Sequence, residues 1–145
     1  PAFAANVGVS ENESGVPRAG HILLVEDDRD CREVLQELLE QEGYSVASAA
    51  GAEEARVMLE GLRPAMVLLD LRLPADDGRS LIRHLRGQAE TAETPVYIIS
   101  GASEVASLST GTGLDRIDGF FEKPLHLPKL LDTVASVVRP VRSAR

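Results

Sequence analysis

The sequence predicts an α/β fold, with a parallel five-stranded sheet between two layers of helices. Three observations predict it. Five short apolar runs alternate with segments whose apolar residues recur at helical spacing, and the connecting loops are short. The run 66–69 is apolar without interruption, which is typical of a strand buried on both faces of a parallel sheet. At 145 residues, the chain has room for one folded domain and not for two.

The expected strands are the apolar runs near residues 21–25, 45–49, 65–70, 95–99 and 118–121. Apolar stripes at helical spacing lie between and after them: Cys31, Val34, Leu35, Leu38 and Leu39; Ala55, Met58, Leu59 and Leu62; Leu81, Ile82 and Leu85; and Leu127, Leu130, Leu131, Val134 and Val137. These stripes are interpreted as helix faces that pack on the sheet. Gly43 supplies a stop after the first helix.

The helix between the fourth and fifth strands is the weakest one. Residues 103–108 allow about two turns, but the segment 109–113 contains glycines and β-branched threonines, which lower helix propensity. A phosphate-binding loop is the alternative interpretation of these glycines, yet the full Gly-x-x-x-x-Gly-Lys-Ser/Thr pattern is absent. We therefore expect a short, frayed or mobile segment here.

The two ends of the chain are expected to lie outside the folded domain. Residues 1–19 are small and polar, which is typical of a flexible arm or linker. The domain itself is expected over residues 20–139, and residues 140–145 form a tail.

Charge and composition exclude several classes of protein. The net charge of −8 argues against a domain that grips nucleic acid, because such domains neutralise phosphates with clustered Lys and Arg. No apolar stretch approaches the roughly 20 residues that span a bilayer, and the start of the chain lacks the pattern of a signal peptide. The single cysteine, Cys31, lies on the apolar face of a predicted helix and is interpreted as a packed, reduced thiol. We expect a cytoplasmic protein that binds neither nucleic acid directly nor membranes.

Charged and polar residues follow the ends of four predicted strands. Glu26 and Asp27 follow the first strand, Asp70 ends the third, Ser100 follows the fourth, and Lys123 follows the fifth. The carboxyl ends of parallel strands share one edge of the sheet, which is where ligands bind in such folds. We therefore expect these five side chains to converge.

The converging acids favour a divalent cation. Two like charges ~4 Å apart repel by about 4 kcal/mol at an effective dielectric of 20, and a hard cation removes that cost. Mg²⁺ prefers oxygen ligands and is often held by one or two carboxylates and a phosphoryl oxygen. Asp27 and Asp70 are the candidate direct ligands, and Glu26 would act through water. Helix capping is the alternative interpretation of the acidic run, and Asp28 is assigned to it.

Lys123 and Ser100 suit phosphoryl chemistry. A lysine ammonium on a long stem reaches a phosphoryl oxygen as a point charge. Ser100 is not well placed as a nucleophile, because none of the three histidines lies where it would serve as a base. As a hydrogen-bond donor to a phosphoryl oxygen it needs no base. Considered alone, Lys123 would be interpreted as an ordinary surface charge, and Ser100 as a turn residue before Gly101.

As a set, these residues resemble the receiver domain of two-component response regulators, and the chain is similar to chemotaxis-regulator-like members over about residues 20–139. Asp70-x-x-x-Pro74-x-x-Asp77-Gly78 is similar to the phosphoacceptor loop of that family. The resemblance implies a flavodoxin-like (βα)5 three-layer sandwich with strand order 2-1-3-4-5. It implies that Asp70 takes a phosphoryl group from the phosphohistidine of a sensor histidine kinase or phosphotransfer protein.

The resemblance also implies the rest of the machinery. The backbone carbonyl of Arg72 would be the remaining protein ligand of Mg²⁺, and Lys123-Pro124 would be joined by a cis peptide bond. After phosphorylation Ser100 would move inward and an aromatic residue would follow it. Here that residue is Phe120, which is alternatively a plain core residue. The resulting switch would change binding to a downstream partner that the sequence does not name, and the chain would catalyse only its own phosphorylation and dephosphorylation.

Departures from the family pattern concern timing and assembly. Arg72 is large and charged, and Ala102 offers no polar group to orient a hydrolytic water. We therefore hypothesise slow self-dephosphorylation compared with an Arg72→Asn, Ala102→Glu variant. The glycine-rich segment after the fourth strand departs from a well-formed signalling helix, so the family's dimer through that region is left open, as a weak homodimer at most.

Other classes fit the residues less well. A haloacid-dehalogenase-type phosphatase would carry its nucleophile on the first strand, with a second aspartate two residues on, where this chain has Arg72 after Asp70. A flavin-binding domain would carry phosphate-binding residues where this chain has three acids. A receiver-like interaction module that works without phosphorylation remains the alternative. The short segment after Val138 leaves two contexts open, a stand-alone regulator or a receiver from a hybrid kinase or multidomain regulator.

Overall fold

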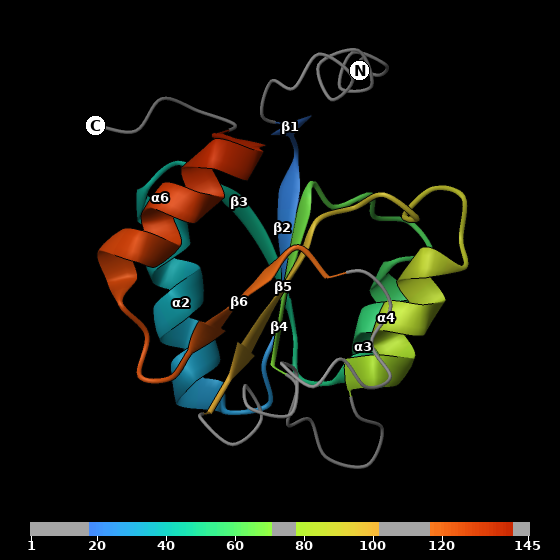
Figure 1. Cartoon of the computed structure of the whole chain (residues 1–145), viewed down its shortest axis with the longest axis horizontal. Coiled ribbons are helices and arrows are strands. Elements are labelled where there is room, and N and C mark those ends of the chain that lie inside the picture. The colour runs from blue at the N-terminus through green and yellow to red at the C-terminus, as the bar shows by residue number, and fades with distance from the viewer. Residues whose placement is uncertain (1–17, 71–77, 102–116, 141–145) are drawn as a thin grey trace.

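The computed structural model describes residues 18–70, 78–101 and 117–140, and a five-stranded parallel sheet forms its centre (Figure 1). Its strands are β2 (His21–Val25), β3 (Ser45–Ala49), β4 (Met66–Asp70), β5 (Val96–Ser100) and β6 (Gly119–Glu122). They lie in the order β3-β2-β4-β5-β6, with every neighbouring pair parallel. When these five strands are numbered 1 to 5 in chain order, their order in the sheet is 2-1-3-4-5, and the predicted strand order is confirmed.

Helices cover both faces of the sheet. The helices α2 (Arg29–Gln41) and α6 (Leu127–Val137) lie on one side, and α3 (Ala52–Met58) and α4 (Gly78–Arg86) lie on the other (Figure 1). The predicted three-layer sandwich is therefore confirmed. The segment 103–113, for which the sequence predicts a weak helix or loop, lies outside the described residues.

The core is split by the sheet into two clusters, because successive strand residues point to opposite faces. Leu23, Val25 and Val67 pack toward α3 and α4 with their neighbours. Ile22 and Leu24 alternate with them and pack toward α2 and α6. All five residues of β4 are buried, as expected for a central strand covered on both sides.

Two residues of the predicted apolar stripes are exposed. The exposed fractions of Val34 and Leu127 are 61% and 39%. Leu35 and Leu39 set the buried face of α2, and Val34 lies about 100° around the helix from Leu35, at the edge of that face. Leu127 is the first residue of α6, one turn before the buried Leu130. Helical spacing alone therefore predicted a wider buried face on α2 and α6 than the structure shows.

The N-terminal and C-terminal segments meet at the end of the molecule opposite the carboxyl ends of β2 and β4. Arg18–Ala19 forms β1 and pairs in parallel with β7, Val138–Arg139, which directly follows α6 (Figure 1). Val138 is fully buried. Residues 18 and 19, which the sequence placed in the flexible arm, thus belong to a strand, and the outer bounds of the domain stay a prediction. Among the described residues, no helix is long and apolar enough to cross a membrane.

Arg86 ties together the starts of the strands that lead to Ser100 and Lys123. Its Nη1 donates to the carbonyl oxygens of Ala92 and Thr94 at 3.1 and 2.7 Å, and its Nη2 lies 3.5 Å from Asp118 Oδ1. The same carboxylate accepts from the backbone N–H of Val96 at 2.8 Å. With only 8% of its side chain exposed, Arg86 links the end of α4 to the starts of β5 and β6.

Replacing Arg86 should therefore destabilise the fold. We expect Arg86→Met to lower the free energy of unfolding by about 3 kcal/mol, because it leaves buried carbonyl groups and a carboxylate without their cation. The exposed Arg83 on the same helix is the matched control, and Arg83→Met should change that energy by less than about 0.5 kcal/mol. Urea unfolding followed by circular dichroism measures both. Equal effects of the two variants would contradict the assignment.

Candidate functional site

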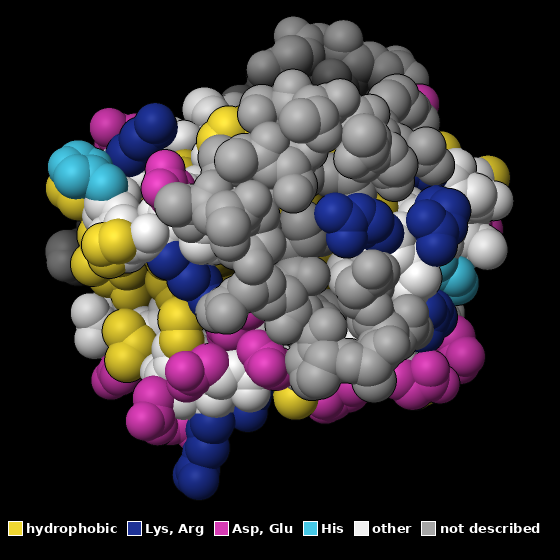
Figure 2. All heavy atoms as spheres, turned by 60° about the horizontal axis from the view of Figure 1, so that its bottom comes forward, with side chains coloured by type: hydrophobic (Ala, Val, Ile, Leu, Met, Phe, Trp, Pro, Cys, Tyr) yellow, Lys and Arg dark blue, Asp and Glu magenta, His cyan; other side chains and the backbone are white. Residues whose placement is uncertain are grey.

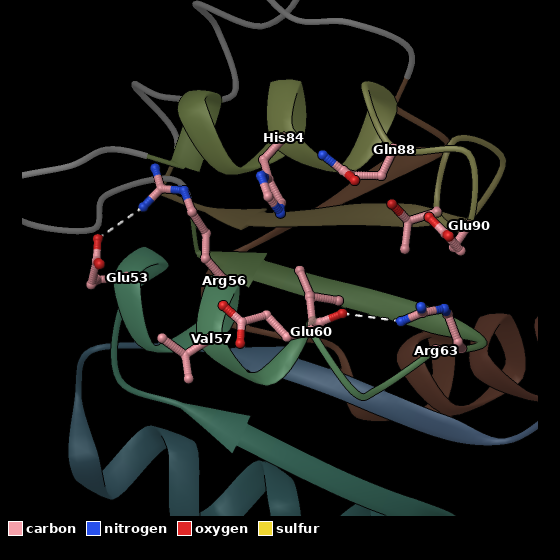
Figure 3. Close-up of a pocket in the computed structure, with 10 residues that line it drawn as sticks. Glu53, Arg56, Val57, Glu60, Arg63, His84, Gln88 and Glu90 are labelled. Atoms are coloured by element: carbon pink, nitrogen blue, oxygen red, sulfur yellow. Dashed lines mark hydrogen bonds and ion pairs between the residues drawn. The ribbon is translucent and has the colours of Figure 1, made fainter.

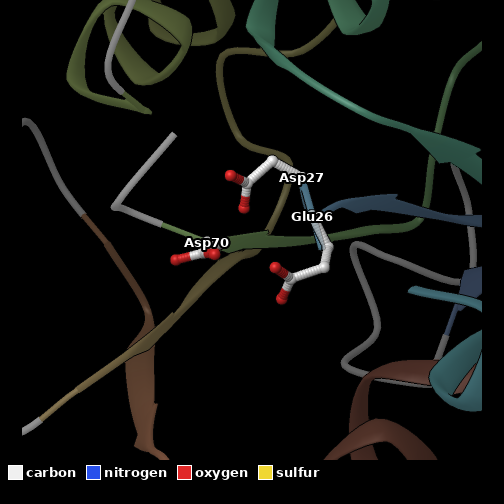
Figure 4. Close-up of side chains that lie close together, drawn as sticks. All are labelled: Glu26, Asp27 and Asp70. Atoms are coloured by element: carbon white, nitrogen blue, oxygen red, sulfur yellow. The ribbon is translucent and has the colours of Figure 1, made fainter. Parts of the chain in front are cut away.

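Three carboxylates meet at the carboxyl ends of the two central strands. Glu26 and Asp27 follow β2, and Asp70 ends the neighbouring β4 (Figure 4). Each offers a carboxylate oxygen, and these oxygens all lie within 4.8 Å of one another. The exposed fractions of Glu26 and Asp70 are 0% and 1%, whereas Asp27 is exposed. The structure thus brings together the three acids that the sequence singled out.

The local backbone explains this placement. Val25 pairs with Leu69, so Glu26 stands next to Asp70 at the same edge. The backbone N–H of Glu26 still donates to Ala49 O at 3.0 Å and prolongs the sheet by one residue. Asp28 then caps α2 by accepting from the N–H of Cys31 at 3.1 Å, which confirms its predicted capping role. Asp27 lies between the end of the sheet and the cap, with its carboxylate facing Asp70 across the strand ends (Figure 4).

Lys123 lies against two of the three acids. Its Nζ is 3.3 Å from Glu26 Oε1 and 3.4 Å from Asp70 Oδ2. The strand β6 brings it there, because Ser100 pairs with Glu122 and the N–H of Lys123 donates to Ser100 O at 2.8 Å. The peptide bond between Lys123 and Pro124 is cis, as the family resemblance implied.

The site holds more negative than positive charge. Burial, together with hydrogen bonding and repulsion from Asp70, raises the pKa of Glu26 from 4.5 to about 7, against the opposing effects of the Asp28 N–H and Lys123. Burial lowers the pKa of Lys123, but attraction to Asp70 and Glu26 outweighs it and raises that pKa above its usual value. Among the described residues, Lys123 sets one positive charge against the carboxylates of Glu26, Asp27 and Asp70, and a divalent cation would neutralise further charge there.

Ser100 carries a buried hydroxyl at the edge of the same site. The residue is fully buried, and its Oγ has no hydrogen-bond partner within the described ranges. A buried polar atom without a partner costs about 1–3 kcal/mol, so such atoms are rare in folded proteins and call for an explanation.

Phe120 does not belong to the core. Its exposed fraction is 45%, whereas the next residue, Phe121, is buried and stacks on Tyr97 with 5.8 Å between ring centroids. The alternation of strand residues turns Phe121 inward and Phe120 outward. The interpretation of Phe120 as a plain core residue is therefore wrong, and its role as a switch stays a prediction.

Part of the predicted phosphoacceptor loop lies outside the described residues. This applies to Arg72, whose carbonyl was a candidate metal ligand, to Pro74 and Asp77, and to Ala102 after Ser100. Gly78 is described and begins α4. A Cβ atom there would lie 3.1 Å from Leu69 Cδ2, so the helix approaches β4 closely just after this loop.

Two residues of α2 also belong to the site. Arg32, which the sequence did not single out, donates from Nη1 to the backbone carbonyl of Glu26 at 2.8 Å. The sequence signal is a basic residue one turn into the helix that follows an acidic loop, which is common on helix surfaces. Burial and the charge of Glu26 raise the pKa of the half-buried Cys31 to about 11. A raised pKa disfavours the thiolate, which agrees with the interpretation of Cys31 as a packed thiol.

A groove lies between α3 and α4, away from the acids. This groove has a volume of about 470 Å³, and charged residues of both signs line it, among them Glu53, Arg56 and Arg63 (Figure 3). Arg56 pairs with Glu53 at 3.1 Å, and Arg63 donates to Leu59 O at 3.1 Å. The groove shares no lining residue with the acidic cluster.

Charged side chains are unevenly distributed over the strand-end face. Figure 2 views this end of the molecule and shows Asp and Glu side chains along its lower rim, while Lys and Arg side chains gather on the side of α3 and α4. The three carboxylates, Lys123 and Ser100 all lie at this end of the molecule. None of these residues lines the groove in Figure 3.

Comparisons with known proteins agree with this geometry. The family model of the response regulator receiver domain matches residues 22–135. The transcriptional regulatory protein AruR of Pseudomonas aeruginosa is 36% identical over 135 residues, which are 90% of this chain and 52% of that protein. The chain therefore spans about half the length of the curated relatives that it matches.

Solved structures show the same fold. A response regulator receiver protein from Pseudomonas putida is 33% identical, with a TM-score of 0.69 over 82% of this chain and 98% of that one. The receiver domain of a sensor histidine kinase from P. aeruginosa is 26% identical, with a TM-score of 0.71 over 80% of this chain and 94% of that one, and it holds a magnesium ion in its active-site cleft. With its fold, its strand-end residues and the family match in agreement, the chain belongs to the response regulator receiver domain family.

Proposed function

We propose that this chain is a working phosphoacceptor, in which Asp70 takes a phosphoryl group from a phosphohistidine with the help of Mg²⁺. The observation that carries the proposal is the cluster of Glu26, Asp27 and Asp70, with Lys123 in contact with two of the three acids. Receiver domains are signalling modules that interact with histidine kinases or phosphotransfer proteins, and they do not turn over a separate substrate.

The donor set fits Mg²⁺. Carboxylate oxygens are the ligands that this hard cation prefers, and three of them lie within 4.8 Å of one another. Asp27 and Asp70 would hold the ion directly, Glu26 would act through water, and the carbonyl of Arg72 would complete the protein ligands. When bound, the ion would neutralise charge on the phosphoryl oxygens. The magnesium in the related kinase receiver domain supports this assignment.

The transfer itself uses the side chains of the chain. A carboxylate oxygen of Asp70 attacks phosphorus in line, the new P–O bond forms as the P–N bond of the phosphohistidine breaks, and the departing imidazole takes up a proton. Lys123 exchanges one of its carboxylate contacts for a phosphoryl oxygen and stabilises the negative charge there. The hydroxyl of Ser100 donates to another phosphoryl oxygen, and its burial without a partner among the described residues supports this role.

The switch would begin at these same contacts. A phosphoryl group on Asp70 draws Ser100 toward it, and Phe120 moves into the space that is freed. Because Phe120 is 45% exposed, this movement would bury apolar surface and change the outer face of β6, where a partner would detect it. Slow loss of the phosphoryl group, which Arg72 and Ala102 imply, belongs to the same proposal.

The phosphoacceptor proposal is tested by mass. We expect acetyl phosphate with Mg²⁺ to add one phosphoryl group to the wild-type chain in an intact mass spectrum, and Asp70→Asn to abolish the adduct because the nucleophile is gone. Chelation of the metal should abolish it too. The exposed Asp132 on α6 is the matched control, and Asp132→Asn should be phosphorylated as fast as wild type.

Failure of the wild-type chain to react would call for a second readout. If the NMR spectrum also stays unchanged on addition of beryllofluoride and Mg²⁺, the phosphoacceptor proposal is wrong. The alternative, a receiver-like interaction module that works without phosphorylation, would then be favoured.

Ser100 should affect activity and stability in opposite directions. Since its buried hydroxyl has no partner among residues 18–70, 78–101 and 117–140, we expect Ser100→Ala to leave the free energy of unfolding unchanged or to raise it by about 1 kcal/mol. The same change should slow phosphorylation by acetyl phosphate about 10- to 100-fold, because a donor to the transferring group is lost. The exposed Ser136 serves as control, and Ser136→Ala should alter neither quantity. A variant that loses stability and keeps its rate would refute the role given to Ser100.

The raised pKa of Glu26 predicts how stability depends on pH without metal. The folded chain binds this proton more tightly than the unfolded chain, so the Glu26 contribution lowers the free energy of unfolding as pH rises from 4.5 to about 7. In EDTA, Glu26→Gln should gain up to about 3 kcal/mol over wild type across that range. Saturating Mg²⁺ should stabilise wild type again at pH 8. Urea unfolding of both proteins at several pH values measures the difference, and a difference that does not grow with pH would contradict the prediction.

A further inference from the structure

The turn that carries the acidic pair is held from three sides. Glu26 N–H donates to Ala49 O of β3, and Asp28 N–H donates to Glu26 Oε2 at 3.2 Å. From α2, Arg32 Nη1 donates to the carbonyl oxygen of Glu26 at 2.8 Å, which is the shortest of these contacts. That carbonyl belongs to the peptide unit that joins Glu26 to Asp27. Because a peptide unit is planar, holding its oxygen fixes the backbone on both sides of it.

Arg32 and Lys123 supply positive charge to the site in different ways. The Nζ of Lys123 contacts the carboxylates of Glu26 and Asp70, the same groups that a metal ion would use. The guanidinium of Arg32 contacts a backbone carbonyl instead, and the residue is half-buried. A cation at this place contacts the ligand-bearing backbone through its carbonyl oxygen and not through a carboxylate.

We propose that Arg32 is a positioning residue for the metal site, and this inference rests on the function proposed above. Through the carbonyl of Glu26, it fixes the peptide between Glu26 and Asp27 and so the directions in which the two carboxylates leave the backbone. Asp27 depends on this most, because it is exposed and lies between the last sheet bond and the cap of α2. Outer groups that orient metal ligands commonly change metal affinity by 10- to 100-fold.

The sign of the effect separates positioning from simple charge. Removing a cation next to a site for Mg²⁺ reduces repulsion, so Coulomb's law predicts tighter metal binding. Loss of the carbonyl contact predicts weaker binding, because the carboxylates are no longer oriented. A weaker site after the loss of a positive charge is therefore explained by geometry and not by the field of the arginine.

The test is the dissociation constant of Mg²⁺, measured by NMR titration of the backbone amides. We expect Arg32→Met, which keeps the apolar stem of the side chain and removes its donors, to raise that constant about 10-fold. Arg32→Gln, whose side chain is too short to reach the carbonyl, should raise it as well, and Arg32→Lys should bring it back toward the wild-type value. Arg29→Met is the matched control, because Arg29 lies on the same turn of α2, carries the same charge and forms an exposed ion pair with Glu33 at 3.0 Å. It should leave the constant within about twofold of wild type.

A second readout excludes a general defect of the fold. The rate of phosphorylation by acetyl phosphate should fall for Arg32→Met at low Mg²⁺ and recover at saturating Mg²⁺, whereas a disturbed fold would stay slow at both concentrations. If Arg32→Met does not fold, Arg32→Gln carries the test. Unchanged or tighter Mg²⁺ binding by the folded variants overturns the inference about Arg32 alone. If the wild-type chain itself binds no Mg²⁺, the proposed metal site fails, and the inference fails with it.

Discussion

The structure depends on one electrostatic constraint, the gathering of three carboxylates at the ends of two buried strands. Glu26 and Asp70 are fully buried there, and Asp27 joins them within 4.8 Å. Burial of charge and mutual repulsion oppose this arrangement, and burial first, then hydrogen bonding to and repulsion from Asp70, raise the pKa of Glu26. The apolar core below it supplies the opposing stability, because β2 and β4 are packed on both faces and cannot move apart without opening two hydrophobic clusters.

Several contacts prepare the same site without removing its excess charge. Lys123 neutralises part of it, and the polar contacts of Asp28 and Arg32 hold the backbone that presents the acids. Ser100 adds a buried hydroxyl without a partner in the described part of the chain. The excess negative charge and the buried hydroxyl are unfavourable in the resting chain, and in the proposed function a bound cation and a phosphoryl group would offset both. This pattern is typical of a site organised for a bound state.

The strands that deliver Ser100 and Lys123 are anchored at their other ends. Arg86 binds the loop before β5 and the residue before β6, far along both strands from the acids. The pairing of β1 with β7 closes the same end of the molecule (Figure 1). These anchoring contacts thus lie at the end of the domain opposite the site.

The sequence by itself determined the fold class, the strand order implied by the family resemblance, and the meeting of Glu26, Asp27, Asp70 and Lys123 at the sheet edge where Ser100 ends its strand, because periodicity marks the strands and parallel strands end at one edge. Tertiary structure alone decided the rest. Periodicity does not give the width of a buried face, so Val34 and Leu127 are exposed against expectation, and Phe120 turns outward. Contacts between elements, such as the bond from Arg32 to the Glu26 carbonyl and the pairing of β1 with β7, depend on distances in space that no spacing along the chain encodes.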